Sequence, residues 1–184
     1  MLWFDRLSPK KQPQAAPPAG EPRLPSGAPL SRPEVITLHG RIVDRVLRMT
    51  EGGWGIPDTF DLRFDVMIFW VSALLRHLHG AGPEYAPLSQ MLWDITFEGL
   101  EESLRDRGVT DIRIASKMRK LLQDATGRRN AYLAAWEDPA ALRVVIARNI
   151  FNGADPDDPR IDTLLANLPG FAESVLEPCP PISC

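Results

Sequence analysis

Cysteine is scarce in this chain, and both of its cysteines, Cys179 and Cys184, lie in a proline-containing tail at the carboxyl end. A disulfide framework or a structural zinc site needs several cysteines spread through the folded region. Both are therefore excluded as the basis of the fold. Such sparing use of cysteine fits a protein from a reducing compartment.

Histidine is also scarce, with three in the whole sequence. His77 and His79 are two residues apart, which directs them to different faces of a helix, and His39 has no acidic residue three or four positions later. The carboxylates between residues 94 and 106 lack the Glu-x-x-His spacing of a di-iron bundle, and the chain has neither a glycine-rich phosphate loop nor a nucleophile elbow. We therefore expect no metal, no cofactor and no enzymatic activity.

The chain has no uncharged apolar stretch of membrane-spanning length. Its most apolar segment, residues 60–79, contains Arg63, Asp65 and Arg76, which leave about ten consecutive uncharged residues where a span needs about 20. We expect this segment to be buried inside the protein. Positive charge is not in excess either, because the net charge is -3 and the pI is near 5.6. These values argue against a DNA-binding protein, which needs a broad basic surface.

A short apolar segment, residues 1–7, opens the sequence and is too short for a signal peptide. Its residues Leu2, Trp3 and Phe4 are candidates for one helical turn that rests on a membrane interface or in a partner's groove. The alternative is a frayed terminus or a turn that folds back on the protein's own domain.

Proline is concentrated near the amino end, where eight of the 18 prolines lie between Ser8 and Pro33. Such a composition favours extended and mobile conformations and cannot bury a core. We therefore predict a flexible segment over residues 1–32, one folded domain over residues 33–176 and a flexible tail over residues 177–184.

Apolar residues recur at helical spacing through the predicted domain, and no segment alternates as a strand. Ser31 and Pro33 predict the start of the first helix, Gly108 a helix end, and Thr110 or Asp111 a cap supplied by a side-chain oxygen. The second helix is apolar on every side, so we expect it at the centre. The predicted fold class is all-α, a single compact domain of about six helices at residues 33–49, 60–79, 84–107, 111–136, 139–151 and 159–168, with a further turn at 171–176.

Two consecutive helices, joined at Gly108, carry opposite charge. The earlier one has an acidic face, and the later one has a basic stripe beside its apolar stripe. One interpretation is that these charges pair across the hairpin, at no more than about 1 kcal/mol for each exposed pair. The other is that they bind partners. The acidic face comprises Glu98, Glu101 and Glu102, and the basic stripe comprises Arg113, Lys117, Lys120 and Arg128.

Several blocks of residues along the chain form one recognisable pattern. The first block runs from Gly55 to Asp61 and continues through Arg63, Phe64 and Asp65. The second block comprises Phe97, Leu100, Glu101, Leu104, Arg105, Gly108 to Ile112, Lys117, Met118, Gly127, Arg128, Ala131 and Tyr132, and it is continued by Ala141, Leu142 and Arg148 to Phe151. In order and spacing these blocks resemble the ubiquinol-cytochrome c chaperone family, in its bacterial branch. The resemblance covers roughly residues 34–152, and no block in it is a catalytic signature.

The resemblance implies an all-α assembly factor that binds newly made cytochrome b as its client and promotes assembly of the bc1 complex, with no chemical step of its own. We expect a cytoplasmic protein, with peripheral contact to the inner face of the cytoplasmic membrane as a further expectation. On charge, the acidic face suits the basic loops of a membrane-protein client, while the basic stripe suits anionic lipid or ribosomal RNA. The rival interpretation is a helical adaptor for another inner-membrane complex.

Overall fold

The computed structural model describes residues 20–52 and 54–177, and this part of the chain is built from α-helices. The expected all-α domain is confirmed, and the described residues contain no strand beyond a single bridge between Arg23 and Pro29. The elements are α1 (Arg32–Glu51), α2 (Phe60–Ala81), a 3-10 turn η2 (Pro83–Tyr85), α3 (Ala86–Asp106), α4 (Asp111–Ala135), α5 (Pro139–Ile150), α6 (Pro159–Ala166) and α7 (Phe171–Leu176).

The helix ends follow from local chemistry. The Glu34 carboxylate accepts hydrogen bonds from both the amide and the hydroxyl of Ser31, which fixes the start of α1. Asp138 and Asp158 accept from backbone amides at the starts of α5 and α6. Thr110 is the residue before α4, as predicted, but no side-chain hydrogen bond caps this helix. That detail of the prediction is wrong.

Gly108 ends α3 and reverses the chain, as the sequence predicted. Its φ of 75° lies in the left-handed region, where glycine carries no steric penalty. The amide of Gly108 donates to the carbonyl of Arg105 at 2.8 Å, and the amide of Val109 donates to that of Leu104 at 3.1 Å. This pair of bonds is the Schellman arrangement that satisfies the last carbonyls of a helix. The two helices of opposite charge therefore form an antiparallel hairpin.

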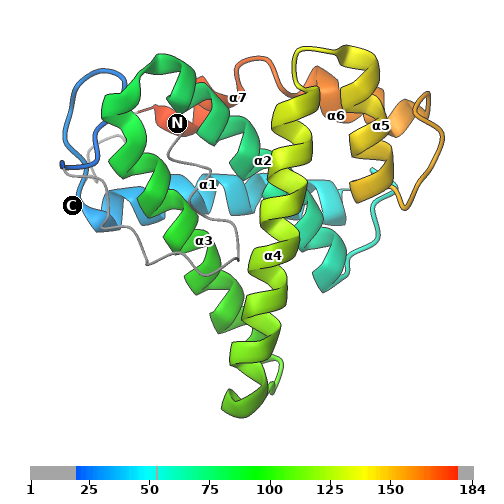
Figure 1. The fold of residues 1–184 in the computed structure, drawn as a ribbon, viewed down its shortest axis with the longest axis horizontal. Coiled ribbons are helices and arrows are strands. Elements are labelled where there is room, and N and C mark those ends of the chain that lie inside the picture. Colours follow the sequence, from blue (N-terminus) through cyan, green and yellow to red (C-terminus); the bar gives the residue numbers. More distant parts are fainter. Residues whose placement is uncertain (1–19, 53, 178–184) are drawn as a thin grey trace.

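Helix α2 lies at the centre of the domain, and α1, α3, α4, α5 and α7 all pack against it (Figure 1). Nearly all of its side chains from Phe64 to Leu75 are buried, as expected for a helix that is apolar all round. Among the helices of the described residues, none is both long enough and apolar enough to cross a membrane.

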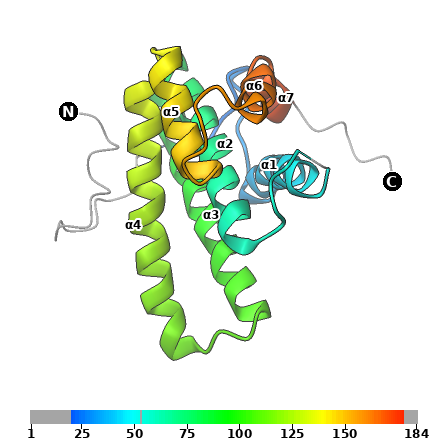
Figure 2. The same cartoon turned by 90° about the vertical axis from the view of Figure 1, so that its right-hand side faces the viewer.

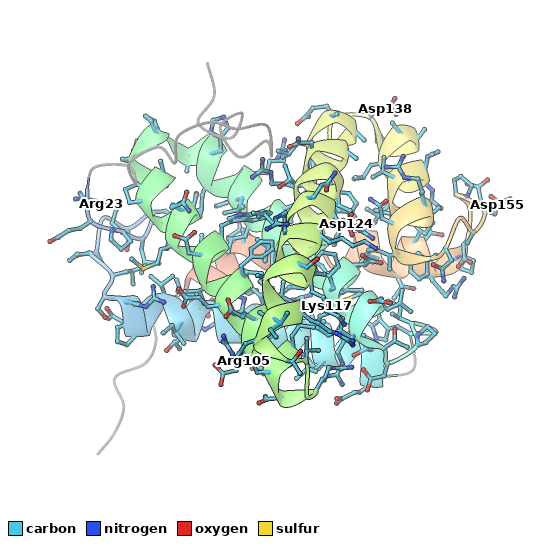
Figure 3. All side chains as sticks on the ribbon, turned by 60° about the horizontal axis from the view of Figure 1, so that its bottom comes forward. Arg23, Arg105, Lys117, Asp124, Asp138 and Asp155 are labelled. Carbon is cyan, nitrogen blue, oxygen red and sulfur yellow. The ribbon has the colours of Figure 1, made fainter. Side chains whose placement is uncertain are left out.

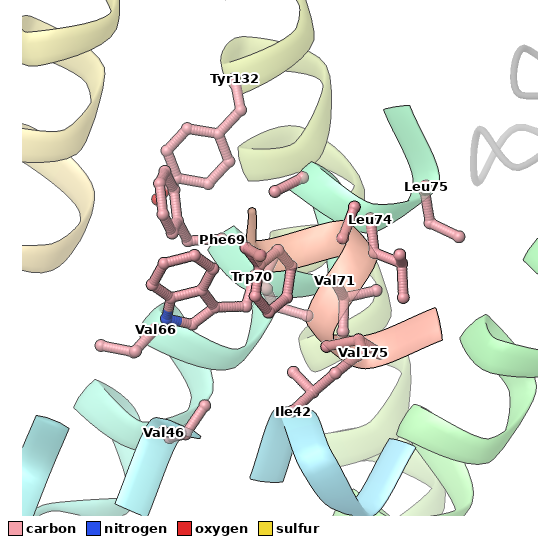
Figure 4. Packing of buried hydrophobic residues seen from close by; sticks show 14 of the residues in the cluster. Ile42, Val46, Val66, Phe69, Trp70, Val71, Leu74, Leu75, Tyr132 and Val175 are labelled. Carbon is pink, nitrogen blue, oxygen red and sulfur yellow. The ribbon is translucent and has the colours of Figure 1, made fainter. Parts of the chain in front are cut away.

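Aromatic rings at the middle of α2 pack against one another in the core (Figure 4). Phe69 meets Trp70 and Tyr132 edge to face, with ring centroids 5.2 and 5.3 Å apart. Trp70 is fully buried, contacts Phe171 of α7 at 4.4 Å, and its indole N–H donates to the sulfur of Met49 at 3.1 Å. Contacts through a single side chain thus join α1, α2 and α7.

The α3–α4 hairpin extends beyond the rest of the domain, with its turn at the far end (Figures 1 and 2). In the distal part of the hairpin only a few apolar side chains are buried, among them Leu104 and Ile114. At the tip the side chain of Ile112 is 92% exposed. The hairpin therefore presents a long surface that no other helix covers.

Residues 20–31 differ from the flexible segment that the sequence predicted. Leu24 is only 4% exposed and belongs to the core cluster. The amide of Gly27 donates to the carbonyl of Leu24, and the amide of Leu30 donates to that of Pro22. This segment thus contains a core residue and turn hydrogen bonds, despite its proline content. The folded domain thus includes residues before position 33.

Replacing Trp70 with alanine removes the side chain that joins α1, α2 and α7. We expect Trp70→Ala to lower the free energy of unfolding by about 3–5 kcal/mol, because a fully buried aromatic leaves a large cavity. Urea unfolding followed by circular dichroism measures this loss. Val144→Ala is the control, since Val144 is 53% exposed, and its effect should stay within about 0.5 kcal/mol. Equal effects of the two variants would contradict the central role of Trp70.

Candidate functional site

An open groove lies between α1, the first turns of α2 and the carboxyl half of α3. Its volume is about 330 Å³, at the lower end of the roughly 300–1,000 Å³ typical of binding sites. Most of its wall is apolar, and polar side chains stand among the wall residues. The apolar residues are Val43, Val46, Leu47, Phe60, Phe64, Met67 and Leu100, and the polar ones are His39, Arg63, Thr96, Ser103, Asp106 and Arg107.

Two arginines on the groove differ in their partners. The Arg63 guanidinium pairs with Asp58 and, at 3.2 Å, with Glu51, and these carboxylates raise its pKa. The Arg107 guanidinium lies over the ring of Phe60, 5.0 Å from the ring centroid. No carboxylate of the described residues approaches Arg107 within 4.0 Å. Arg107 therefore presents a positive charge that is not neutralised by an ion pair.

His39 also lines the groove and is only 9% exposed. Burial lowers the pKa of its imidazole to about 4, because the charged form is poorly solvated there. The ring is therefore neutral at physiological pH. Sequence reasoning rejected His39 as a metal ligand and did not foresee its place in a groove, since the groove forms from three helices.

On the other side of α2, a half-buried ion pair joins α2 to α4. The Nε atom of Arg128 lies 2.7 Å from an Oδ atom of Asp65, whose side chain is 10% exposed. The Arg128 guanidinium also lies over the Phe64 ring, at 5.3 Å from its centroid. Phe64 and Asp65 are adjacent in sequence, so this short stretch of α2 contributes both to the groove and to the ion pair.

Further polar groups surround this ion pair in the core. Tyr132 of α4 is fully buried, and burial raises the pKa of its hydroxyl above the usual value, while the nearby Asn149 of α5 acts in the opposite direction. Arg129 is 1% exposed, lies 5.1 Å over the ring of Trp93 and donates to Asn130 at 3.3 Å. The buried guanidinium of Arg129 thus packs on an aromatic ring of α3.

The basic stripe is only partly as predicted. The basic side chains of the first half of α4, Arg113, Lys117 and Lys120, are exposed. Figure 3 labels Lys117 on this half of the helix. None of the three has a carboxylate of the described residues within 4.0 Å. Arg128 differs, because its side chain is only 26% exposed and is engaged by Asp65. Helical spacing could not reveal that α2 brings a carboxylate to this position.

The acidic face lies on the outer side of α3, but two of its members have arginine partners. Glu98 pairs with Arg32 at the start of α1, and Glu101 pairs with Arg105 one turn later at 2.7 Å. Glu102 is exposed and forms no ion pair within the described residues. The charges therefore do not pair across the hairpin between these carboxylates and the basic stripe. Leu2, Trp3 and Phe4, the remaining predicted contact residues, lie outside the described part of the chain.

Comparison of the sequence with known protein families finds one match. The sequence profile described as "Ubiquinol-cytochrome C chaperone" matches residues 53–168, more than half of the chain. The chain belongs to the ubiquinol-cytochrome c chaperone family. The match contains α2 to α6 and therefore both the α2 and α3 walls of the groove and the Asp65–Arg128 ion pair. No curated protein sequence matches the chain.

A solved structure agrees with this assignment. The chain is similar to the crystal structure of the Cbp3 homolog from Brucella abortus, with a TM-score of 0.62 and 26% sequence identity. The similarity covers 79% of this chain and 81% of the other. Membership of this family, together with the structural similarity, supports a chaperone role for ubiquinol-cytochrome c reductase.

The blocks that carried the family resemblance in the sequence come together in space. Phe60, Arg63 and Phe64 from the first block and Leu100 from the second line the groove. Asp65 from the first block meets Arg128 from the second in the ion pair. Sequence spacing identified these residues but not their contacts. The groove and the ion pair, rather than a linear stripe, are therefore the candidate functional site.

The Asp65–Arg128 pair should make stability depend on pH. Burial raises the pKa of Asp65 from 3.8 to about 6, Arg128 acts against this shift, and Asp61 and Asp124 add to it. The folded state therefore binds the Asp65 proton more tightly than the unfolded state does. The contribution of this proton to the free energy of unfolding is fully present below about pH 4 and is lost as the pH rises through 6.

We expect the free energy of unfolding of Asp65→Asn not to show this pH dependence. Between pH 4 and 7 the free energy of unfolding of the wild type should fall by at most roughly 3 kcal/mol relative to that of the variant. His39 contributes the opposite slope, because its lowered pKa costs stability as the pH falls below 6.5, but it is present in both proteins and cancels. Urea unfolding at several pH values measures the difference, and parallel curves would contradict the assignment to Asp65.

Proposed function

We propose that this chain binds newly made cytochrome b and promotes assembly of the ubiquinol-cytochrome c reductase complex, acting by binding alone. The observation that carries the proposal is the open apolar groove of α1, α2 and α3 in a member of this chaperone family. A membrane-protein client exposes apolar surface before assembly. Covering it releases about 25 cal/mol for each Å² removed from water, so an apolar groove suits a holding function.

The acidic face suits the same client, and Glu102 is its member without an ion pair among the described residues. Cytoplasmic loops of membrane proteins are enriched in lysine and arginine. A client segment seated near α3 would place such loops beside these carboxylates. Contacts of this kind contribute more to orientation and rate of encounter than to affinity.

We also propose a peripheral contact with anionic lipid at the inner face of the cytoplasmic membrane, made by the distal α3–α4 hairpin. Arg113, Lys117 and Lys120 are exposed there, and the apolar side chain of Ile112 is 92% exposed at the tip. Cations that surround an exposed apolar residue are typical of surfaces that rest on lipid headgroups. Ribosomal RNA offers the same negative charge but no apolar interior for Ile112.

Deleting the gene should cause a selective loss of the b-type haem signal of the reductase in membranes. A reduced-minus-oxidised haem spectrum that scores b-type and c-type cytochromes together measures this, and the wild-type gene should restore the signal. An unchanged spectrum would contradict the proposal and favour the helical adaptor of another inner-membrane complex. Persistent copurification with a finished complex would favour that adaptor as well.

Reversing the exposed cations tests the lipid contact. The triple variant Arg113→Glu, Lys117→Glu and Lys120→Glu should lose at least about 3 kcal/mol of attraction to phosphatidylglycerol vesicles, on the order of a hundredfold in partitioning. Flotation with vesicles containing or lacking phosphatidylglycerol measures it.

The control variant reverses three exposed arginines elsewhere, Arg23, Arg48 and Arg148, and so has the same net charge. It should float like the wild type. Equal loss in both variants would show a general charge effect, and unchanged flotation of the α4 variant would exclude the proposed contact. Binding to ribosomes but not to vesicles would assign the basic stripe to RNA.

A further inference from the structure

We infer that the groove of α1, α2 and α3 is where the client binds, and that it takes an apolar peptide segment carrying a carboxylate, which Arg107 recognises. This inference rests on the proposed holding function but makes a separate claim about the site and about the chemistry of the bound segment. Three observations support it: the shape of the groove, a glycine in its wall, and the rim charge.

The size and lining of the groove match a few side chains rather than a whole helix. Its volume of about 330 Å³ lies at the lower limit of common binding sites. Met67 and Leu100 stand in its wall, and Met is a side chain that adapts to differently shaped apolar partners. A partner would therefore insert apolar side chains from one face, while the rest of its segment stays outside.

Gly99 lines the groove on its α3 side and has no side chain to fill the space there. It lies inside α3, where glycine is unfavourable for the helix, and it is exposed. A Cβ atom placed at Gly99 would meet no other atom within 4 Å, so packing in the domain does not require glycine there. The missing side chain instead leaves space at the mouth of the groove, through which a peptide can approach.

Charge at the rim selects the kind of segment. The Arg107 guanidinium lies over Phe60 and has no carboxylate within 4.0 Å among the described residues, whereas Arg63 is already paired with Asp58 and Glu51. Asp106 also lines the groove, and it forms no ion pair with Arg107. A carboxylate on the incoming segment would gain a charge-assisted hydrogen bond with Arg107. His39 is neutral and adds no competing charge.

The test uses the full chain and a fluorescein-labelled peptide, rich in leucine and alanine, that carries a single glutamate. Gly99→Leu should fill the mouth of the groove and weaken binding by about tenfold or more, as measured by fluorescence anisotropy. Gly127→Leu is the matched control. Gly127 is also exposed inside a helix and would also place a Cβ in open space, but it is not part of the groove. It should leave affinity within about twofold of wild type.

The charge claim is tested with Arg107→Gln and with a second peptide that has glutamine in place of glutamate. The wild type should prefer the glutamate peptide by about fivefold to tenfold, and Arg107→Gln should bind both peptides alike. Circular dichroism and thermal unfolding verify that each variant is folded. Wild-type affinity in Gly99→Leu, or no binding of either peptide by the wild-type chain, would overturn the inference.

The outcome can be separated from that of the proposed function. Reintroducing Gly99→Leu into the deletion strain should fail to restore the b-type haem signal, while Gly127→Leu should restore it. If Gly99→Leu restores the signal although it abolishes peptide binding, the groove is not the client site and the proposed function stands. If deletion leaves the spectrum unchanged while Gly99→Leu still blocks peptide binding, the groove binds peptides but cytochrome b is not its client.

Discussion

The need to cover α2 on all sides is the constraint on which the rest of the structure depends. This helix is apolar around its whole circumference, so every face left in water would cost free energy in proportion to its area. Helices α1, α3, α4, α5 and α7 each cover part of it. The aromatic contacts of Phe69 and Trp70 fix how these helices meet, since the rings join α2 to α4 and to α7. Five helices of the described residues are therefore gathered around one.

Covering α2 in this way also buries one of its charged residues, Asp65. A carboxylate removed from water needs a partner, and Arg128 of α4 supplies it at 2.7 Å. The Arg128 guanidinium simultaneously packs on Phe64, which faces the groove wall. Phe64 and Asp65 are adjacent in α2. This short segment therefore contacts α4 through Arg128 and also forms part of the groove wall. A polar contact inside the core thus positions an apolar surface at its edge.

The surface divides into regions with different physical character. The groove is apolar with Arg107 at its rim, the outer side of α3 is acidic, and the distal half of α4 is basic. These regions lie on α1 to α4, the four longest helices of the described residues, and the hairpin of α3 and α4 carries two of them away from the core (Figures 1 and 2). In the function proposed above, these separate surfaces have separate tasks: the groove would take apolar segments, and the two charged regions would meet client loops and lipid.

The sequence alone determined the all-α class, the helix boundaries to within a few residues, the central place of α2 and the turn at Gly108, because periodicity, proline and glycine act locally along the chain. It also identified the family through blocks of residues. Only the tertiary structure decided which residues meet. It moved Arg128 from the basic stripe to an ion pair with Asp65, matched Glu98 with Arg32, placed Leu24 in the core and formed the groove from three helices. Helical spacing describes the faces of one helix, whereas these contacts depend on how separate helices cross, and that is set by packing of the whole core.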